Sequence, residues 1–454
     1  MLLGAKDGKW YFERWKNLTA LKKKVLLITY YWPPSGGIGV LRCLKIAKYL
    51  RENGWEPVIF TADGADYPTL DHSNDHDVPE GATVLRHPIW EPYQAYRKLT
   101  GKPPGANVNN VFYVQEDKGR WAHELAVWVR SNFFIPDARC FWIPSAVRFL
   151  CRYLKAHPVD AIFSDGPPHT NTRIATLVSR KTGIPWLADF QDPWTQIDYY
   201  QLLKLTRWGD ARHRRMEQEA FRQASKITIV SPTWKKDLEA LGARNVSVIP
   251  WGFDPGDYPP EPRAVGGKFA FTHLGIMGYD RRPDVFFKVL ADLCRDTPGF
   301  QEDLRLKLVG QVDQSVKAAL QGHGLMGAVE MPGNVPRSEA LSLTLNSPIL
   351  LLLLNQQPNA QGRIPGKLFE YLAARRPVFC LQPMESDVAG ILARAGAGQA
   401  LGYEDEAGIR QAVLGLYRQY KTGELLQPLA SDISPYSIQS LTREIAGFLD
   451  EIAG

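Results

Sequence analysis

The sequence predicts an α/β protein made of two doubly wound, Rossmann-like domains with a cleft between them. Three observations lead to this expectation. The chain has 454 residues, which is too long for one hydrophobic core. Apolar segments suited to parallel strands alternate with helical segments in two successive series. A stretch rich in proline and glycine, 251–267, separates the two series and is typical of an interdomain linker.

The first series begins with the apolar strand 24–30, a loop that contains glycines, and a helix that ends at Asn53 with Gly54 as its C-cap. Strand 56–61 completes a βαβ unit, whose first turn lacks the G-x-G-x-x-G spacing of a dinucleotide fold. Segment 64–120 is rich in Pro, Gly, Asp and Asn, so we expect a loop-rich insertion. Further strands are predicted at 159–164, 184–190, 226–230 and 246–249.

The second series repeats the strand and helix pattern after the linker. Its predicted strands are 269–274, 304–309, 349–354 and 377–381. Apolar residues recur at helical spacing over 436–452. We therefore expect an N-terminal arm at 1–20, a first domain at 21–255, a second domain at 265–435, and a terminal helix at 436–454 that returns to the first domain. The carboxyl ends of both sheets should face the cleft.

Composition narrows the class of protein. The net charge of +6 fits an anionic ligand or a membrane surface but is too small to argue for nucleic acid, and no zinc-finger or RNA-recognition signature is present. Five scattered cysteines without a C-x-x-C pair favour reduced thiols in a cytoplasmic protein. No apolar run approaches the roughly 20 residues of a membrane span, and the N-terminus lacks the features of a signal peptide.

The arm at 1–20 mixes aromatic and basic side chains. Trp10, Tyr11, Phe12 and Trp15 are interspersed among Lys6, Lys9, Arg14 and Lys16. Such a segment is able to lie on a membrane surface, and the alternative is an extension packed on the first domain. The sequence leaves both interpretations open.

The segment 362–373 carries the clearest site pattern. A wholly apolar strand and a short polar loop precede Gly366 and Lys367, which open a predicted helix, and Glu370 follows one turn later. Backbone N–H groups at a helix start bind anions, and Lys367 adds a positive charge. Glu370 is able to accept hydrogen bonds from hydroxyls. A diphosphate next to a ribose requires these groups, so we expect a nucleotide here.

Five motifs in this order resemble bacterial GT-B glycosyltransferases of family 4, and they span the chain from about residue 24 to the terminal helix. They are Ile-Thr-Tyr-Tyr-Trp-Pro-Pro-Ser-Gly-Gly-Ile-Gly at 28–39, Ala-Asp-Phe-Gln-Asp-Pro-Trp at 188–194, Val-Ile-Pro-Trp-Gly-Phe-Asp at 248–254, Gly-Asn-Val-Pro at 333–336 and Gly-Lys-Leu-Phe-Glu-Tyr-Leu-Ala at 366–373.

The resemblance implies transfer of a sugar from a nucleotide-diphosphate donor, with retention of the anomeric configuration and without a metal or other cofactor. It implies a glycan or lipid-linked acceptor, as in lipopolysaccharide, capsule or exopolysaccharide synthesis at the cytoplasmic face of the membrane. Two positions depart from the family. Gly362 stands where the first of two paired glutamates is common, with Glu370 matching the second, and Trp251 replaces an asparagine before Gly252. The loop 359–362 is the alternative source of contacts to the donor sugar.

Two further groups are predicted on the donor side. Arg281 and Arg282 follow strand 269–274, and an arginine fork suits a phosphate; the alternative is a surface turn. Gly36 and Gly37 allow the first loop to approach the donor phosphates closely, and the alternative is a plain tight turn. For Glu370 the alternative is a pair with Lys367 or Arg363 on its helix. For Lys367 it is a solvated lysine, which the helix dipole disfavours.

Four residues at strand ends are candidates on the acceptor side. His169 follows strand 159–164, and the resemblance places a histidine near this end, where it could bond the sugar or move a proton. Asp165 competes for this role, and a helix-capping histidine is the alternative. Asp189 and Asp192 lie at the end of strand 184–190. Asp192 is a candidate acceptor contact or base, or else a turn residue before Pro193. With Lys367, His169 and Asp192 form the predicted catalytic set.

Two other classes fit the same fold. A sugar-nucleotide epimerase would need an array of acidic and histidine groups around a bound UDP-sugar, for which the sequence has no match. A catalytically silent binding protein is favoured by Gly362, whereas Lys367, Glu370 and the glycine loop argue against it.

Overall fold

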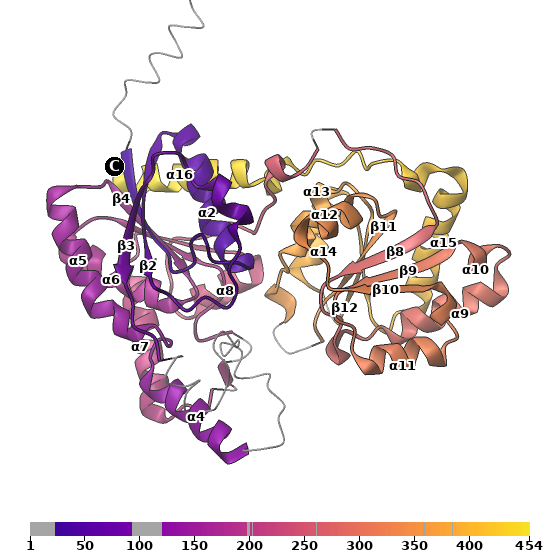
Figure 1. Ribbon diagram of the computed structural model, residues 1–454, viewed down its shortest axis with the longest axis horizontal. Helices are drawn as coiled ribbons and strands as arrows, with labels where there is room; N and C mark the ends of the chain where they lie inside the picture. The colour runs from indigo at the N-terminus through magenta and orange to yellow at the C-terminus, as the bar shows by residue number, and fades with distance from the viewer. Residues whose placement is uncertain are drawn as a thin grey trace, which may run out of the picture.

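The computed structural model describes residues 23–92, 120–197, 200–201, 203–259, 261–356, 360–383 and 385–454. The predicted arm at 1–20 lies outside these residues, as do part of the predicted insertion and Asn359 of the polar loop. Within the described residues, two parallel sheets form two domains side by side (Figure 1). The predicted fold of two Rossmann-like domains is confirmed.

The first sheet has the strand order β3-β2-β1-β4-β5-β6-β7, and every neighbouring pair is parallel. Its strands are β1 Lys23–Ile28, β2 Trp55–Asp63, β3 Thr83–Pro88, β4 Ala161–Gly166, β5 Trp186–Phe190, β6 Lys226–Ile229 and β7 Val246–Val248. Its helices are α2 Ile38–Leu50, α4 Arg120–Phe133, α5 Ile143–Ala156, α6 His169–Thr182, α7 Arg207–Gln223 and α8 Pro232–Ala240. Short 3-10 turns lie at η1 Arg51–Asn53, η2 His72–Asp77 and η4 Cys140–Trp142.

The second sheet has the order β10-β9-β8-β11-β12-β13 and is also parallel. Its strands are β8 Phe269–Leu274, β9 Leu304–Val309, β10 Val329–Gly333, β11 Ile349–Leu353, β12 Val378–Gln382 and β13 Gly398–Gly402. The helices are α9 Asp284–Asp296, α10 Phe300–Asp303, α11 Gln314–Gly322, α12 Arg337–Leu345, α13 Lys367–Ala373, α14 Asp387–Ala395, α15 Glu406–Thr422 and α16 Ile438–Ala453. Turns η6 Pro255–Asp257, η7 Tyr279–Arg281, η8 Met326–Ala328, η9 Ala360–Gly362, η10 Glu424–Leu426 and η11 Ser434–Tyr436 connect them.

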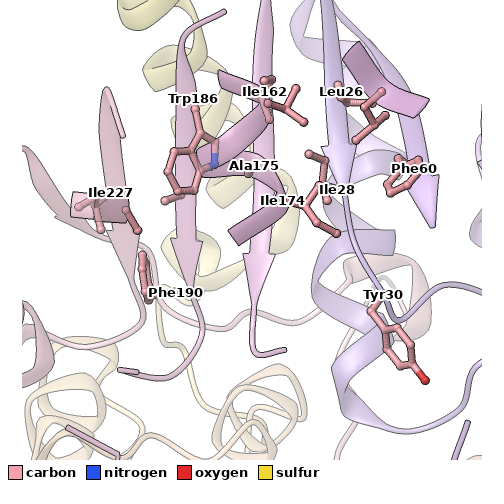
Figure 2. Packing of buried hydrophobic residues seen from close by; sticks show 14 of the residues in the cluster. Leu26, Ile28, Tyr30, Phe60, Ile162, Ile174, Ala175, Trp186, Phe190 and Ile227 are labelled. Carbon is pink, nitrogen blue, oxygen red and sulfur yellow. The ribbon is translucent and has the colours of Figure 1, made fainter. Parts of the chain in front are cut away.

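The core of the first domain lies on both faces of its sheet. On one face, side chains of α5, α6 and α7 pack against the strands, and Figure 2 shows Ile174 and Ala175 of α6 among Ile28, Ile162 and Trp186. The other face is covered by α2 and by α16, which crosses from the second domain. Parallel strands buried on both faces explain the continuous apolar runs in the sequence.

Three strands, β3, β10 and β13, were not predicted. β3 lies in the segment predicted to be loop-rich and carries polar residues because it forms an edge of the first sheet. β10 and β13 form the two edges of the second sheet and contain proline or glycine, which lower the strand propensity. These edge strands depend on pairing with a neighbour more than on local preference. No helix in the described parts of the chain has the length and apolar character needed to cross a bilayer.

Candidate active site

Lys367 lies at the carboxyl end of the second sheet. It is the first residue of α13, which follows β11, and its Nζ donates a hydrogen bond to the carbonyl oxygen of Leu274 at 2.7 Å. Leu274 ends β8, so the ammonium ties the start of α13 to the end of that strand. Burial, and next the positive charge of Arg281, lower the pKa of Lys367 to about 8. Lys367 is thus a poorly solvated cation that an anion at this position would stabilise.

The structure separates the two predicted arginines. Arg281 ends η7, donates to the carbonyl oxygen of Ile276 at 3.2 Å, and is close enough to lower the pKa of Lys367. Arg282 turns away and donates from Nε to both carboxylate oxygens of Asp284, at 2.8 and 2.9 Å. Arg281 therefore shares the electrostatic environment of Lys367, whereas Arg282 is engaged at the start of α9.

Glu370 accepts a hydrogen bond from Arg337 Nη1 at 3.1 Å. Arg337 opens α12, directly after the Gly-Asn-Val-Pro motif, and its Nη2 also lies 3.8 Å from Asp257 of the linker. The sequence did not single out Arg337, which forms an ion pair with Glu370 from another helix. Glu370 and Arg337 line a cavity of about 50 Å³ together with Gly366 and residues of α2 and the linker.

The glycine loop of the first domain brings α2 to this cavity. Gly36 donates its N–H to the carbonyl of Thr69 at 2.9 Å, and a Cβ on Gly36 would lie 2.7 Å from Thr69 Oγ1. Gly37 has a φ of 87° and precedes the first residue of α2, Ile38. A Cβ on Gly366 would collide with the side chain of Ile38. The two loops predicted to hold the donor are therefore in contact across the domain boundary.

Gly362 forms a second contact between the domains. It ends η9, and a Cβ at this position would lie 2.5 Å from Cδ1 of Trp234 in α8. Trp234 is buried, and its backbone N–H donates a hydrogen bond to Ser231 Oγ at 3.3 Å. The indole therefore fills the space into which a larger residue at 362 would extend. Trp234 carries no local sequence signal for this contact.

Asp165 and Asp189 lie at the carboxyl end of the first sheet, but both are fully buried and paired. Asp165 accepts hydrogen bonds from Thr29 Oγ1 at 2.9 Å and Asn171 Nδ2 at 2.8 Å, and burial raises its pKa to about 7. Asp189 forms a two-pronged ion pair with Arg42 of α2, at 2.6 and 2.8 Å.

Arg42 extends this network toward the linker. Its other N–H groups donate to the carbonyls of Ile249 and Pro250, at 2.9 and 2.8 Å, and its guanidinium lies over the ring of Trp251. Arg42 thus connects a strand end of the first sheet, α2 and the start of the linker. Sequence reasoning missed it because its partners lie more than a hundred positions away.

His169 opens α6 and is buried. Its ring stacks on Trp194 with 4.4 Å between centroids and 2° between planes, and Trp194 Nε1 donates to His213 Nδ1 of α7 at 3.1 Å. Burial, and next the nearby His213, lower the pKa of His169 to about 3, so its imidazole is neutral at physiological pH. Asp192, two residues beyond β5, is partly buried. His169 is able to exchange a hydrogen bond but not to supply a charge.

A group of three carboxylates, Asp77, Asp254 and Asp257, is the arrangement in the described residues that could hold a metal ion. The ammonium groups of Lys45 and Lys48 already form ion pairs with these carboxylates. Lys45 Nζ lies 2.6 Å from Asp254 and 2.7 Å from Asp77, and Lys48 Nζ lies 2.6 Å from Asp77. These pairs hold the linker on α2.

Comparison with known proteins gives a family for the first domain and a fold for the whole chain. Residues 36–252 match the family described as glycosyl transferase 4-like domain. Sucrose-phosphate synthase from Thermosynechococcus elongatus is 14% identical, with a TM-score of 0.54 over 95% of this chain and 96% of that chain. Alr3699/HepE of Anabaena, solved in complex with UDP, is 13% identical, with a TM-score of 0.53 over 95% and 97%.

A third similar structure is the lipopolysaccharide outer core galactosyltransferase WaaB. It is 13% identical, with a TM-score of 0.52 over 94% of this chain and 99% of that chain. No curated protein matches the chain. At these identities the structural similarities establish the two-domain fold.

Proposed function

We propose that this chain, which belongs to the GT-B glycosyltransferases of family 4, moves a sugar from a nucleotide-diphosphate donor to a glycan or lipid-linked acceptor, with retention of the anomeric configuration. The observation that carries the proposal is the group Lys367, Arg281 and Arg337 at the carboxyl end of the second sheet. Ligands of open α/β sheets bind at this end.

The chemistry follows from the charges. Breaking the bond between sugar and diphosphate leaves negative charge on the departing phosphate, so fixed cations and N–H donors favour the transition state. Lys367 is held by a carbonyl oxygen, has a lowered pKa, and stands at the first residue of α13. An arriving diphosphate would replace that carbonyl as its partner and keep the lysine protonated.

We assign Glu370 to the ribose hydroxyls, with Arg337 fixing its carboxylate. UDP bound to Alr3699/HepE supports a nucleotide donor. His169 is the candidate group near the donor sugar and the acceptor, as a neutral hydrogen-bond partner. Asp192 is the candidate for contact with the acceptor hydroxyl. The proposed reaction uses no metal or other cofactor, because lysine and arginine neutralise the diphosphate.

We place the reaction at the cytoplasmic face of a membrane, in the synthesis of a cell-surface polysaccharide. The galactosyltransferase WaaB, which acts on lipopolysaccharide, supports this setting. The aromatic and basic arm at 1–20 supports it as well.

The test is an assay of donor turnover with UDP-, GDP- and dTDP-sugars, with and without acceptor. Release of one nucleoside diphosphate together with a sugar transferred to the acceptor supports the proposal. A change of sugar configuration without release of nucleotide would instead identify an epimerase. Binding of donor without any turnover would identify a silent binding protein, for which Gly362 is the observation in favour.

A further inference from the structure

The first domain exposes large apolar side chains along one side of α4. Leu125, Trp128, Val129 and Phe133 are 50%, 38%, 36% and 62% exposed. Their spacing of i, i+3, i+4 and i+8 places them on one side of the helix. The helix is anchored by its other positions, since Val127 and Ser131 are buried. A soluble protein rarely leaves such a row open to water unless it binds something.

Further aromatic rings continue this row beyond the helix. Trp128 and Phe133 are in edge contact, Phe134 contacts Phe141, and Phe141 contacts Trp90 with 5.1 Å between ring centroids. Phe141 and Trp90 are 51% and 60% exposed, although they come from separate segments. We name the aromatic surface by its exposed members, which are Trp90, Leu125, Trp128, Val129, Phe133 and Phe141.

Basic side chains lie next to the aromatic surface at the start of α7. Asn132 of α4 donates to the carbonyl of Lys204 at 2.9 Å and accepts from the backbone N–H of Thr206 at 2.7 Å, which fixes α4 on α7. Helix α7 carries five arginines against three acidic residues. Arg207 and Arg212 are exposed, and Arg212 lies over the exposed ring of Trp208.

The same elements are attached to the acceptor side of the candidate active site. Asp137, just after α4, accepts hydrogen bonds from the N–H and hydroxyl of Thr170, both at 2.8 Å. Thr170 follows His169, whose stacking partner Trp194 is bonded to α7. In Figure 1, α4 and α7 lie at the lower end of the first domain. The aromatic surface is thereby linked, through Asp137 and Thr170, to His169 on the candidate acceptor side of the first domain.

We propose that the aromatic surface and the arginines at the start of α7 dock this protein on an anionic lipid bilayer. The inference rests on the proposed function, because it supplies the membrane contact for a lipid-linked acceptor. Apolar rings next to exposed arginines are suited to the interface of a membrane with anionic head groups. The charge selects an anionic bilayer over a second copy of this chain, whose corresponding surface would carry the same arginines.

The experiment measures sedimentation of the full chain with vesicles. Wild type should bind vesicles of phosphatidylglycerol and phosphatidylcholine. Added salt should weaken this binding, because it screens the attraction between the arginines and the anionic head groups. The double variant Trp128→Ser, Phe133→Ser should bind at least about tenfold more weakly, because binding no longer transfers two aromatic side chains from water into the membrane interface. Arg207→Gln with Arg212→Gln should lose about fivefold per arginine on these vesicles and little on phosphatidylcholine alone.

The matched control is Met326→Ser, which removes an exposed apolar side chain from the second domain. It should bind as wild type does. All substituted side chains are exposed, so the thermal midpoint should not change, and an unchanged midpoint validates the comparison. Equal vesicle binding by wild type and the Trp128→Ser, Phe133→Ser variant would overturn the proposal. So would a dimer that this variant converts to monomer without any change in vesicle binding.

Deletion of 1–20 separates the two membrane candidates. If the deletion abolishes binding while the aromatic variant binds as wild type does, the arm is the anchor and the proposal is wrong. Donor turnover with a soluble acceptor fragment is measured in parallel. Its absence in wild type would overturn the proposed function, whereas its retention in the aromatic variant, together with lost vesicle binding, supports docking as a separate property.

Discussion

Asp165 and Asp189, at the carboxyl end of the first sheet, are buried and hydrogen-bonded inside their domain. Lys367 and Glu370, at the same end of the second sheet, are partly exposed, and Glu370 lines the interdomain cavity. Asp189 has a bidentate arginine partner, and Lys367 has a single carbonyl oxygen. A paired, buried charge stabilises an arrangement, and a cation held by one neutral oxygen remains available to a ligand. Asp165 and Asp189 therefore support the structure of the first domain, and Lys367 is where we propose the phosphate chemistry.

The largest expected effect tests whether the ion pair of Asp189 with Arg42 stabilises the first domain. Arg42→Met should destabilise the protein by about 3–5 kcal/mol, because Asp189 is then left buried without its partner. Urea unfolding at neutral pH measures the loss. Arg295→Met is the control, since Arg295 pairs with Asp292 at the surface, and such a pair contributes less than about 1 kcal/mol. Equal stability losses in the two variants would contradict the structural assignment of Asp189.

The second prediction tests the proposed role of Lys367 in turnover. Lys367→Ala should lower turnover by roughly 10²–10³-fold while the fold is retained, because the departing phosphate loses a fixed cation. The variant's unfolding midpoint supplies the control. Turnover within about threefold of wild type would be incompatible with the loss expected from removing such a group.

The same lysine predicts a pH dependence. Its pKa of about 8 in the free protein means that Lys367 is protonated at neutral pH and loses its charge as the pH rises through that value. If the charge binds the donor, kcat/KM for the donor should fall above about pH 8. Lys367→Arg keeps a charge at every accessible pH, so any residual activity of this variant should lack that fall.

The sequence predicted the fold better than the long-range contacts that complete it. Apolar runs such as Ile349–Leu353 indicate buried parallel strands by themselves, and Lys367 and Glu370 stand out because they follow such a run. Arg42, Arg337 and Trp234 were missed because their partners are distant in sequence, and no periodicity records such a contact. β13 was missed because its Gly-rich strand is specified by pairing with β12.

Gly362 offers a further test, at the contact between the two domains. Gly362→Ala should force the domains apart or displace Trp234, and overpacking of this kind costs about 1–3 kcal/mol. We expect an increase in KM for the donor, with Trp234→Ala partly restoring the affinity of the Gly362→Ala protein, as a double-mutant cycle would reveal. Gly322→Ala is the control, since a Cβ there meets no atom within 4 Å. Additive effects of the two substitutions would show that the contact does not govern donor binding.

The smallest expected effect is that of removing metal ions. The carboxylates Asp77, Asp254 and Asp257 face Lys45 and Lys48, whose hydrogen bonds lower the pKa of Asp254 although burial opposes this. A divalent ion would have to displace two ammonium groups that already neutralise the cluster, and the proposed phosphate site uses lysine and arginine. Incubation with EDTA should therefore leave both turnover and the thermal midpoint unchanged. Complete loss of turnover that Mg²⁺ or Mn²⁺ restores would contradict this prediction. It would indicate that a bound metal ion, and not Lys367 and Arg281, neutralises the departing phosphate.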